Sequence, residues 1–218
     1  MLYSDPAFYL TLATSGMLLS AFLIASSMRL RSFVWLFRLQ SLCLGMYAIA
    51  LSFAIGETDL LVMAGLIIVL KAFLLPYALL TTVERSSAAA RLEAYFRPSA
   101  LLFIAAALIA FSFLVVVRVF PEIGSDIFVV GTAVSLLIIG FSLLVLRGDL
   151  YGQSIGFLVM ENGIFTLGLS LVGGMPLFVE IGIFLDVLVS FIIMVALTYR
   201  VQSTHVTVKT ERLRELIG

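Results

Sequence analysis

Seven long apolar runs dominate the sequence, and each is close to the roughly 20 residues that an α-helix needs to span the hydrocarbon core of a bilayer. Hydrophobic residues make up 62% of the 218-residue chain and charged residues only 12%, against about 25% charged residues in soluble domains. The sequence therefore predicts an all-α, polytopic membrane protein with a single domain, 1–218. The predicted helices lie at about 7–28, 32–55, 59–82, 99–119, 126–146, 152–173 and 178–200, followed by a tail at 201–218.

The distribution of Lys and Arg predicts how the helices are oriented. One set of connections and the tail carry most of the basic residues, namely Arg29, Arg31, Arg85, Arg91, Arg97, Arg147, Arg200, Lys209, Arg212 and Arg214. The other set carries Arg118, together with acidic residues such as Glu57 and Glu122. Basic residues accumulate in cytoplasmic loops, so the amino terminus is predicted outside and the tail in the cytoplasm.

Several function classes lack support in the sequence. The 13 basic and 13 acidic residues balance, and no basic stripe alternates with aromatic residues, so a nucleic-acid partner is not indicated. The single cysteine, Cys43, excludes an internal disulfide and a CxxC cluster, and the single histidine, His205, has no clustered ligand. No P-loop and no GxSxG motif is present. The chain is predicted to catalyse nothing by itself and to hold no metal or cofactor.

Three ionisable residues, Lys71, Glu161 and Asp186, are predicted to lie deep in the membrane. At 1.5 Å per residue, each is about 14–18 Å along its predicted helix from the outer or inner end. A charge in hydrocarbon costs about 2.5–3.5 kcal/mol on insertion scales and therefore needs a partner or a task. Two interpretations remain open: Lys71 and one acid form a locking ion pair, which adds little net stability, or the three groups belong to a proton relay.

Other residues are predicted to support these three. Asn162 places an amide beside Glu161, and Glu180 lies near the outer surface. Arg38 lies about two turns from the cytoplasmic end of its helix, near enough to reach the interface, and is predicted to orient the helix. Pro76 cannot donate to the carbonyl of Ala72, which predicts a kink and a local water beside Lys71. Small residues allow helices to approach closely, and the candidates are Gly156, Gly163, Gly168 and Gly182.

Three segments carry a family resemblance. The segments FLVMENGIF, MPLFVEIGIFLDVLVSFIIMVAL and KAFLLPYALLT, with QSL at 40–42 and THVT in the tail, resemble the hydrogenase-4 component E family. These chains are membrane subunits of group-4 nickel–iron hydrogenases, which are related to respiratory complex I. The last three predicted helices are also similar to the K-type subunit of complex I, which has membrane glutamates on two adjacent helices. Glu161 matches the first glutamate in context; Glu180 and Asp186 compete for the second, and Asp186 is preferred for its depth.

The resemblance implies a membrane subunit of a redox-driven complex that translocates protons or sodium ions across a bacterial or archaeal cytoplasmic membrane. It implies antiporter-like membrane subunits as neighbours in the lipid bilayer, and soluble hydrogenase-type subunits on the cytoplasmic side that hold the nickel–iron and iron–sulfur centres. One alternative is a subunit of a cation/proton antiporter complex without a hydrogenase module. Another is a structural membrane anchor, and a seven-helix receptor is disfavoured by the absence of a sizeable outer loop.

Overall fold

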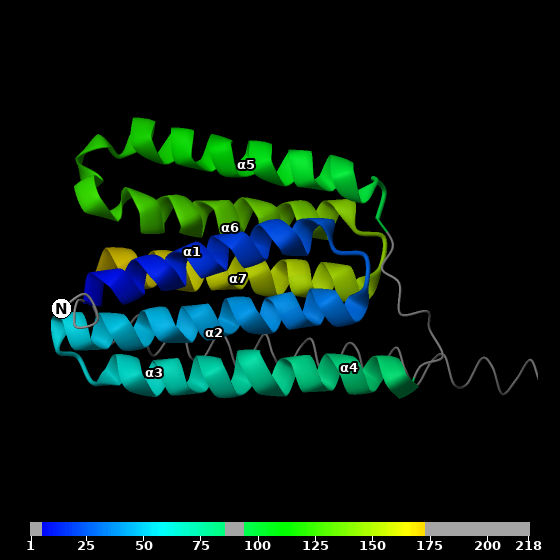
Figure 1. The fold of residues 1–218 in the computed structure, drawn as a ribbon, viewed down its shortest axis with the longest axis horizontal. Helices are drawn as coiled ribbons and strands as arrows, with labels where there is room; N and C mark the ends of the chain where they lie inside the picture. Colours follow the sequence, from blue (N-terminus) through cyan, green and yellow to red (C-terminus); the bar gives the residue numbers. More distant parts are fainter. Residues whose placement is uncertain (1–5, 86–93, 173–218) are drawn as a thin grey trace, which may run out of the picture.

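The computed structural model describes residues 6–85 and 94–172, which are helical almost throughout (Figure 1). The elements are α1 (Pro6–Ser26), α2 (Leu30–Ile55), α3 (Asp59–Ile67), the π-helix η2 (Ile68–Leu74), α4 (Leu75–Arg85), α5 (Pro98–Val119), the 3-10 helix η3 (Pro121–Asp126), α6 (Ile127–Leu146) and α7 (Leu150–Val172). In this part of the chain the predicted all-α fold is confirmed. The predicted helix at 178–200 and the tail at 201–218 lie outside the described residues.

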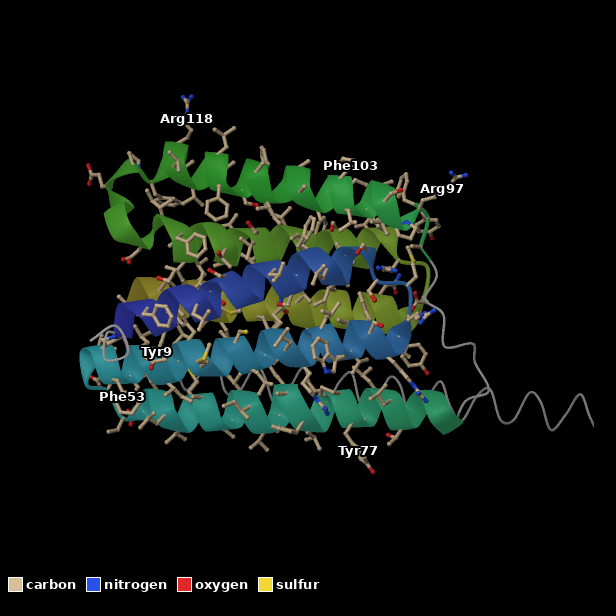
Figure 2. The ribbon with its side chains drawn as sticks, in the orientation of Figure 1. Tyr9, Phe53, Tyr77, Arg97, Phe103 and Arg118 are labelled. Carbon is tan, nitrogen blue, oxygen red and sulfur yellow. The ribbon has the colours of Figure 1, made fainter. Side chains whose placement is uncertain are left out.

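Five helices within the described ranges are long and apolar enough to cross a membrane. They are Pro6–Ser26, Leu30–Ile55, Asp59–Thr81, Pro98–Val119 and Ile127–Leu146. Large apolar side chains point away from the bundle on its outer faces, as Figure 2 shows for Phe53, Tyr77 and Phe103, which are 73%, 66% and 78% exposed. An apolar surface of this extent suits a lipid environment better than water. The described part of the chain therefore has the character of a helical membrane protein.

Local sequence signals explain where several helices begin and end. Gly56 adopts a left-handed conformation with φ of 80° and ends α2, because glycine enters this region without steric cost. Pro98 stands in the first turn of α5, where its missing N–H costs nothing. The Asp149 carboxylate accepts the Gly152 N–H at 2.7 Å and caps the start of α7. These signals fix where the helices begin and end, and therefore how far along them the buried polar residues lie.

Four helices, α1, α2, α6 and α7, form the centre of the bundle, as their mutual packing shows. In Figure 1, α5 lies along the outer side of α6, and the continuous rod α3–η2–α4 lies along α2 at the opposite edge. With α3–η2–α4 taken as one rod, successive rods are antiparallel, so their junctions alternate between the two ends of the bundle. Arg97 and Arg118 accordingly lie at opposite ends (Figure 2).

Glycines bring α6 and α7 together at backbone distance. A Cβ at Gly163 would lie 2.8 Å from the Ala133 carbonyl oxygen and 2.8 Å from the Leu137 nitrogen, and one at Gly156 would lie 2.8 Å from the Leu143 Cβ. The predicted role of Gly156 and Gly163 in close packing is thus confirmed. For Gly168 the prediction is not confirmed within the described residues, since a Cβ there meets no described atom within 4 Å. Gly182 lies outside the described residues.

A matched pair of glycine substitutions tests this contact. Gly163→Ala is expected to destabilise the protein by about 1–3 kcal/mol, because overpacking against rigid backbone forces the two helices apart. Gly168→Ala, on the same helix, is expected to leave stability unchanged or to raise it slightly, because alanine has the higher helix propensity. Thermal unfolding of the purified variants in detergent measures both. Equal melting temperatures for the two variants would contradict the assigned contact.

Candidate functional site

A π-helical segment presents Lys71 to the bundle interior. A continuous helix was predicted at 59–82, whereas the structure has η2 inserted between α3 and α4, with the Leu75 N–H bonded to the Leu70 carbonyl five residues earlier. Within η2, Lys71 and Ala72 are the buried residues. Single-turn π segments are uncommon and occur frequently at functional sites. Pro76 lies two residues after the end of η2. Proline is one of the recognised causes of helix distortion.

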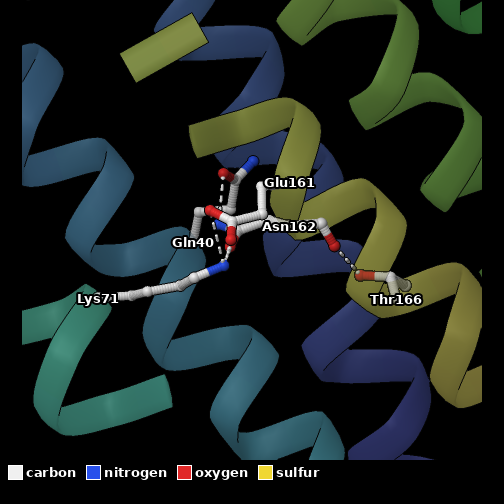
Figure 3. A network of polar contacts seen from close by, with 5 residues as sticks. All are labelled: Gln40, Lys71, Glu161, Asn162 and Thr166. Atoms are coloured by element: carbon white, nitrogen blue, oxygen red, sulfur yellow. Dashed lines mark hydrogen bonds and ion pairs between the residues drawn. The ribbon is translucent and has the colours of Figure 1, made fainter. Parts of the chain in front are cut away.

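The buried ammonium group of Lys71 contacts three side chains of α7. Its Nζ donates to Asn162 Oδ1 at 3.1 Å, lies 3.3 Å from Glu161 Oε2, and lies 4.3 Å from the centre of the Phe165 ring. Figure 3 shows Lys71 reaching from η2 toward Glu161 and Asn162. The Lys71 side chain is 0% exposed and that of Glu161 is 7% exposed. A cation between a carboxylate, an amide oxygen and an aromatic face is stabilised by all three.

Two further polar side chains, Gln40 and Thr166, extend the site to α2 and along α7. Asn162 Nδ2 donates to Gln40 Oε1 at 3.1 Å, and Gln40 Nε2 donates to the Met17 carbonyl oxygen of α1 at 3.4 Å. Thr166 Oγ1 donates to the Asn162 carbonyl oxygen at 2.8 Å (Figure 3). Gln40, Asn162 and Thr166 are each 0% exposed. A chain of hydrogen bonds therefore links η2 to α7, α2 and α1 through the apolar core.

The polarity of this chain is fixed by the chemistry of its members. Lys71 can only donate, so Asn162 must turn its oxygen toward Lys71 and its NH₂ toward Gln40. Gln40 in turn presents its oxygen to Asn162 and its NH₂ to α1. Buried polar networks in low dielectric are strong when each member is satisfied. The arrangement holds a charge pair at a defined position in the apolar core.

The structure brings some of the predicted site residues together. Lys71, Glu161 and Asn162 form one cluster, and Gln40, which carried no predicted role of its own, joins them. A glutamine inside an apolar helix was the available signal for it, because a buried amide needs partners. Arg38, for which a role in orienting its helix was predicted, donates from Nε to the Ala72 carbonyl oxygen at 2.7 Å. Asp186 and Glu180 lie outside the described residues.

A second buried cation, Arg147, closes the end of α1. Its Nη2 donates to the carbonyl oxygens of Ala25 at 2.9 Å and Ser27 at 2.8 Å, and its guanidinium lies 5.0 Å from the centre of the Phe33 ring. The residue is 1% exposed, and this burial lowers the pKa of the guanidinium, while the Asp149 carboxylate acts in the opposite direction. The last carbonyls of a helix lack partners within the helix and attract cations. Sequence analysis counted Arg147 only as a loop charge.

No group of three or more His, Cys, Asp or Glu side chains that could hold a metal ion occurs within residues 6–85 and 94–172. The buried donors and acceptors of the described site are instead an ammonium, a carboxylate and two amides. This chemistry suits proton exchange or charge pairing.

Comparisons with known proteins give one informative match. No family model matches the chain, and no solved structure matches it. The chain is 32% identical over 209 residues to a protein of Mycobacterium tuberculosis named "Uncharacterized protein Rv0085", and the match covers 94% of this chain and 94% of the relative. With near-complete coverage of both chains at this identity, the protein belongs to the same family as the uncharacterized protein Rv0085 of M. tuberculosis.

Proposed function

We propose that the chain is a membrane subunit of a hydrogenase-4-like, complex-I-related complex that couples redox chemistry to proton or sodium translocation, and that Lys71 and Glu161 belong to its ion path. The observation that carries the proposal is their buried ion pair at 3.3 Å within an apolar helical bundle. Ionisable groups inside a membrane are costly, and those that persist usually mark ion pathways or proton relays.

The proposal includes the arrangement of the whole chain. Seven helices cross a bacterial or archaeal cytoplasmic membrane, with the amino terminus outside, and Asp186 or Glu180 supplies the second acid of the path. Charge supports this orientation: the end of the bundle carrying Arg29, Arg31, Arg97 and Arg147 faces the cytoplasm, and the end carrying Glu57, Asp59, Glu122 and Asp126 faces outward. Antiporter-like subunits flank the chain, and the nickel–iron and iron–sulfur centres belong to soluble partner subunits.

Glu161→Gln tests the role in the ion path. The substitution keeps the shape of the side chain and removes its negative charge, so ion uptake into inverted vesicles is expected to fall at least tenfold when normalised to assembled complex and electron-transfer rate. Glu122→Gln is the matched control, because Glu122 is an exposed acid at the end of the bundle. Uptake at the normal rate in the Glu161 variant would exclude the residue from the path.

A structural membrane anchor is the second candidate function. The contacts of Lys71 with α7 are the observation that supports it. Lys71 contacts Glu161 and Asn162 across a sequence separation of about 90 residues, which is how a locking pair joins two helices. In that case neutral substitutions reduce assembly and leave uptake per assembled complex unchanged. The same vesicle experiment therefore separates the two functions.

A further inference from the structure

Arg38 donates a hydrogen bond to the carbonyl beside Lys71 at which a kink and a local water were predicted. Pro76 has no N–H to donate to the Ala72 carbonyl four residues earlier, and Arg38 Nε donates to this oxygen at 2.7 Å across the interface between α2 and η2. The Arg38 guanidinium also lies 5.5 Å from the centre of the Phe73 ring. Arg38 thus contacts the two residues that directly follow Lys71. No other described side chain is recorded as donating to this carbonyl.

We propose that Arg38 is a positioning residue, which holds η2 in its π-helical register and thereby directs Lys71 toward Glu161 and Asn162. Neighbouring residues of a helix are rotated by about 100° around its axis. Loss of the extra residue in the π turn would therefore turn Lys71 away from α7 by a comparable angle. The hydrogen bond from Arg38 is made to Ala72, the residue after Lys71, within the π-helical segment. It therefore restrains the rotation of Lys71 about the helix axis.

The geometry of α2 supports this role. Arg38 and Gln40 are two residues apart, so their side chains leave α2 in nearly opposite directions. Arg38 binds the backbone of η2, which carries Lys71, and Gln40 binds the side chain of Asn162 on α7. One turn of α2 therefore holds both sides of the Lys71–Asn162 contact, and its rigidity fixes their spacing.

An arginine suits this position better than a lysine does. The Nε–H of Arg lies in a rigid planar fork and donates from a fixed direction, whereas a lysine ammonium rotates freely at the end of a flexible stem. The planar guanidinium also lies against the Phe73 ring. We therefore expect Arg38→Lys to retain the charge and to lose much of the positioning effect.

The experiment uses the two lysines of the chain, Lys71 and Lys209. The full chain with a Lys209→Arg substitution, labelled with ¹³C,¹⁵N-lysine and placed in lipid nanodiscs, gives a single lysine side-chain signal by NMR. The Phe165 ring, 4.3 Å from Nζ, is expected to shift the Lys71 methylene protons upfield. Phe165→Leu removes this shift and calibrates it.

Arg38→Leu is expected to abolish the upfield shift, and Arg38→Leu combined with Pro76→Ala is not expected to restore it, because a backbone N–H at position 76 bonded to the Ala72 carbonyl four residues earlier favours the α-helical register, in which Lys71 turns away from α7. Arg31→Leu, an exposed arginine of the same helix, is the control and leaves the signal unchanged. If Arg38→Leu does not fold, Arg38→Lys, which keeps the charge, is the second variant and is expected to lose much of the upfield shift. An unchanged signal in Arg38→Leu, or a restored shift in the double variant, overturns the proposal.

The link to transport rests on the proposed function and is measured separately. If Lys71 serves the ion path, uptake per assembled complex falls in Arg38→Leu and stays low when Pro76→Ala is added. If the NMR signal follows the expected pattern while uptake stays normal in both Arg38→Leu and Glu161→Gln, the positioning role stands and the ion-path role fails. Failure of the NMR pattern alone removes Arg38 and leaves Glu161 to its own test.

Discussion

Lys71→Met is expected to destabilise the protein by about 3–5 kcal/mol, because it leaves the Glu161 carboxylate without the cation that lies 3.3 Å away. The same substitution removes the donor that orients Asn162. Methionine fills a similar volume, so the loss comes from the stranded charge and not from a cavity. SDS titration in mixed micelles measures the change in unfolding free energy.

The double variant Lys71→Met with Glu161→Gln separates structure from function. Removing both charges of a buried pair is often neutral for stability, whereas removing one is costly. We therefore expect the double variant to recover most of the stability lost in Lys71→Met. If the pair belongs to the ion path, uptake per assembled complex stays low in this stable double variant. If the pair is a lock, uptake per assembled complex is normal in the single and the double variants, and only stability and assembly recover in the double variant.

Arg118→Met is the control for removing a basic side chain. Arg118 is exposed on α5 and points away from the bundle in Figure 2. Its loss is expected to leave unfolding and uptake at the wild-type level. A Lys71→Met variant as stable as Arg118→Met would show that the contacts of Lys71 contribute nothing to the fold.

The sequence predicts the helices of this protein better than it predicts their contacts. Apolar runs of the right length place the described helices from α1 to α7, because the length needed to span a bilayer leaves little freedom. The depth of Lys71 and Glu161 along their helices follows from the rise per residue. Their contact depends also on rotation about the helix axis, and a π turn changes that rotation without leaving a clear mark in the sequence.

Pro76 and Arg38 show which kind of contact the sequence did not predict. Because Pro76 has no N–H, the sequence predicted that the Ala72 carbonyl lacks its α-helical donor and that a local water lies there. The hydrogen bond that the structure shows at this carbonyl comes from Arg38. Arg38 was predicted to orient its helix, and its partner, the Ala72 carbonyl, lies 34 residues away on the next rod. Long side chains have several polar groups within reach, and packing alone decides among them.

Arg147→Met is expected to be the second strongly destabilising substitution, with a loss of about 3–5 kcal/mol. The guanidinium donates to the Ala25 and Ser27 carbonyl oxygens at 2.9 and 2.8 Å. Hydrogen bonds to a charged group contribute about 1.5–3 kcal/mol each, and buried carbonyls left without donors incur the cost of desolvation. Methionine preserves the apolar stem against Phe33 and removes every hydrogen-bond donor. The loss of unfolding free energy therefore measures what the hydrogen bonds of Arg147 to the end of α1 contribute.

Arg97→Met is the matched control for Arg147→Met, because both arginines lie at the same end of the bundle and count equally as loop charges. Arg97 is exposed and points outward in Figure 2, so its loss is expected to leave the melting temperature of the detergent-purified protein unchanged. Arg147→Lys is expected to lie between the two, because lysine keeps the charge but cannot direct two donors from one rigid fork. If Arg147→Met melts at the same temperature as Arg97→Met, Arg147 acts as a topological charge alone. A lower melting temperature in Arg147→Met alone instead shows that this arginine joins the end of α1 to the junction of α6 and α7. That junction leads into α7, which carries Glu161 and Asn162.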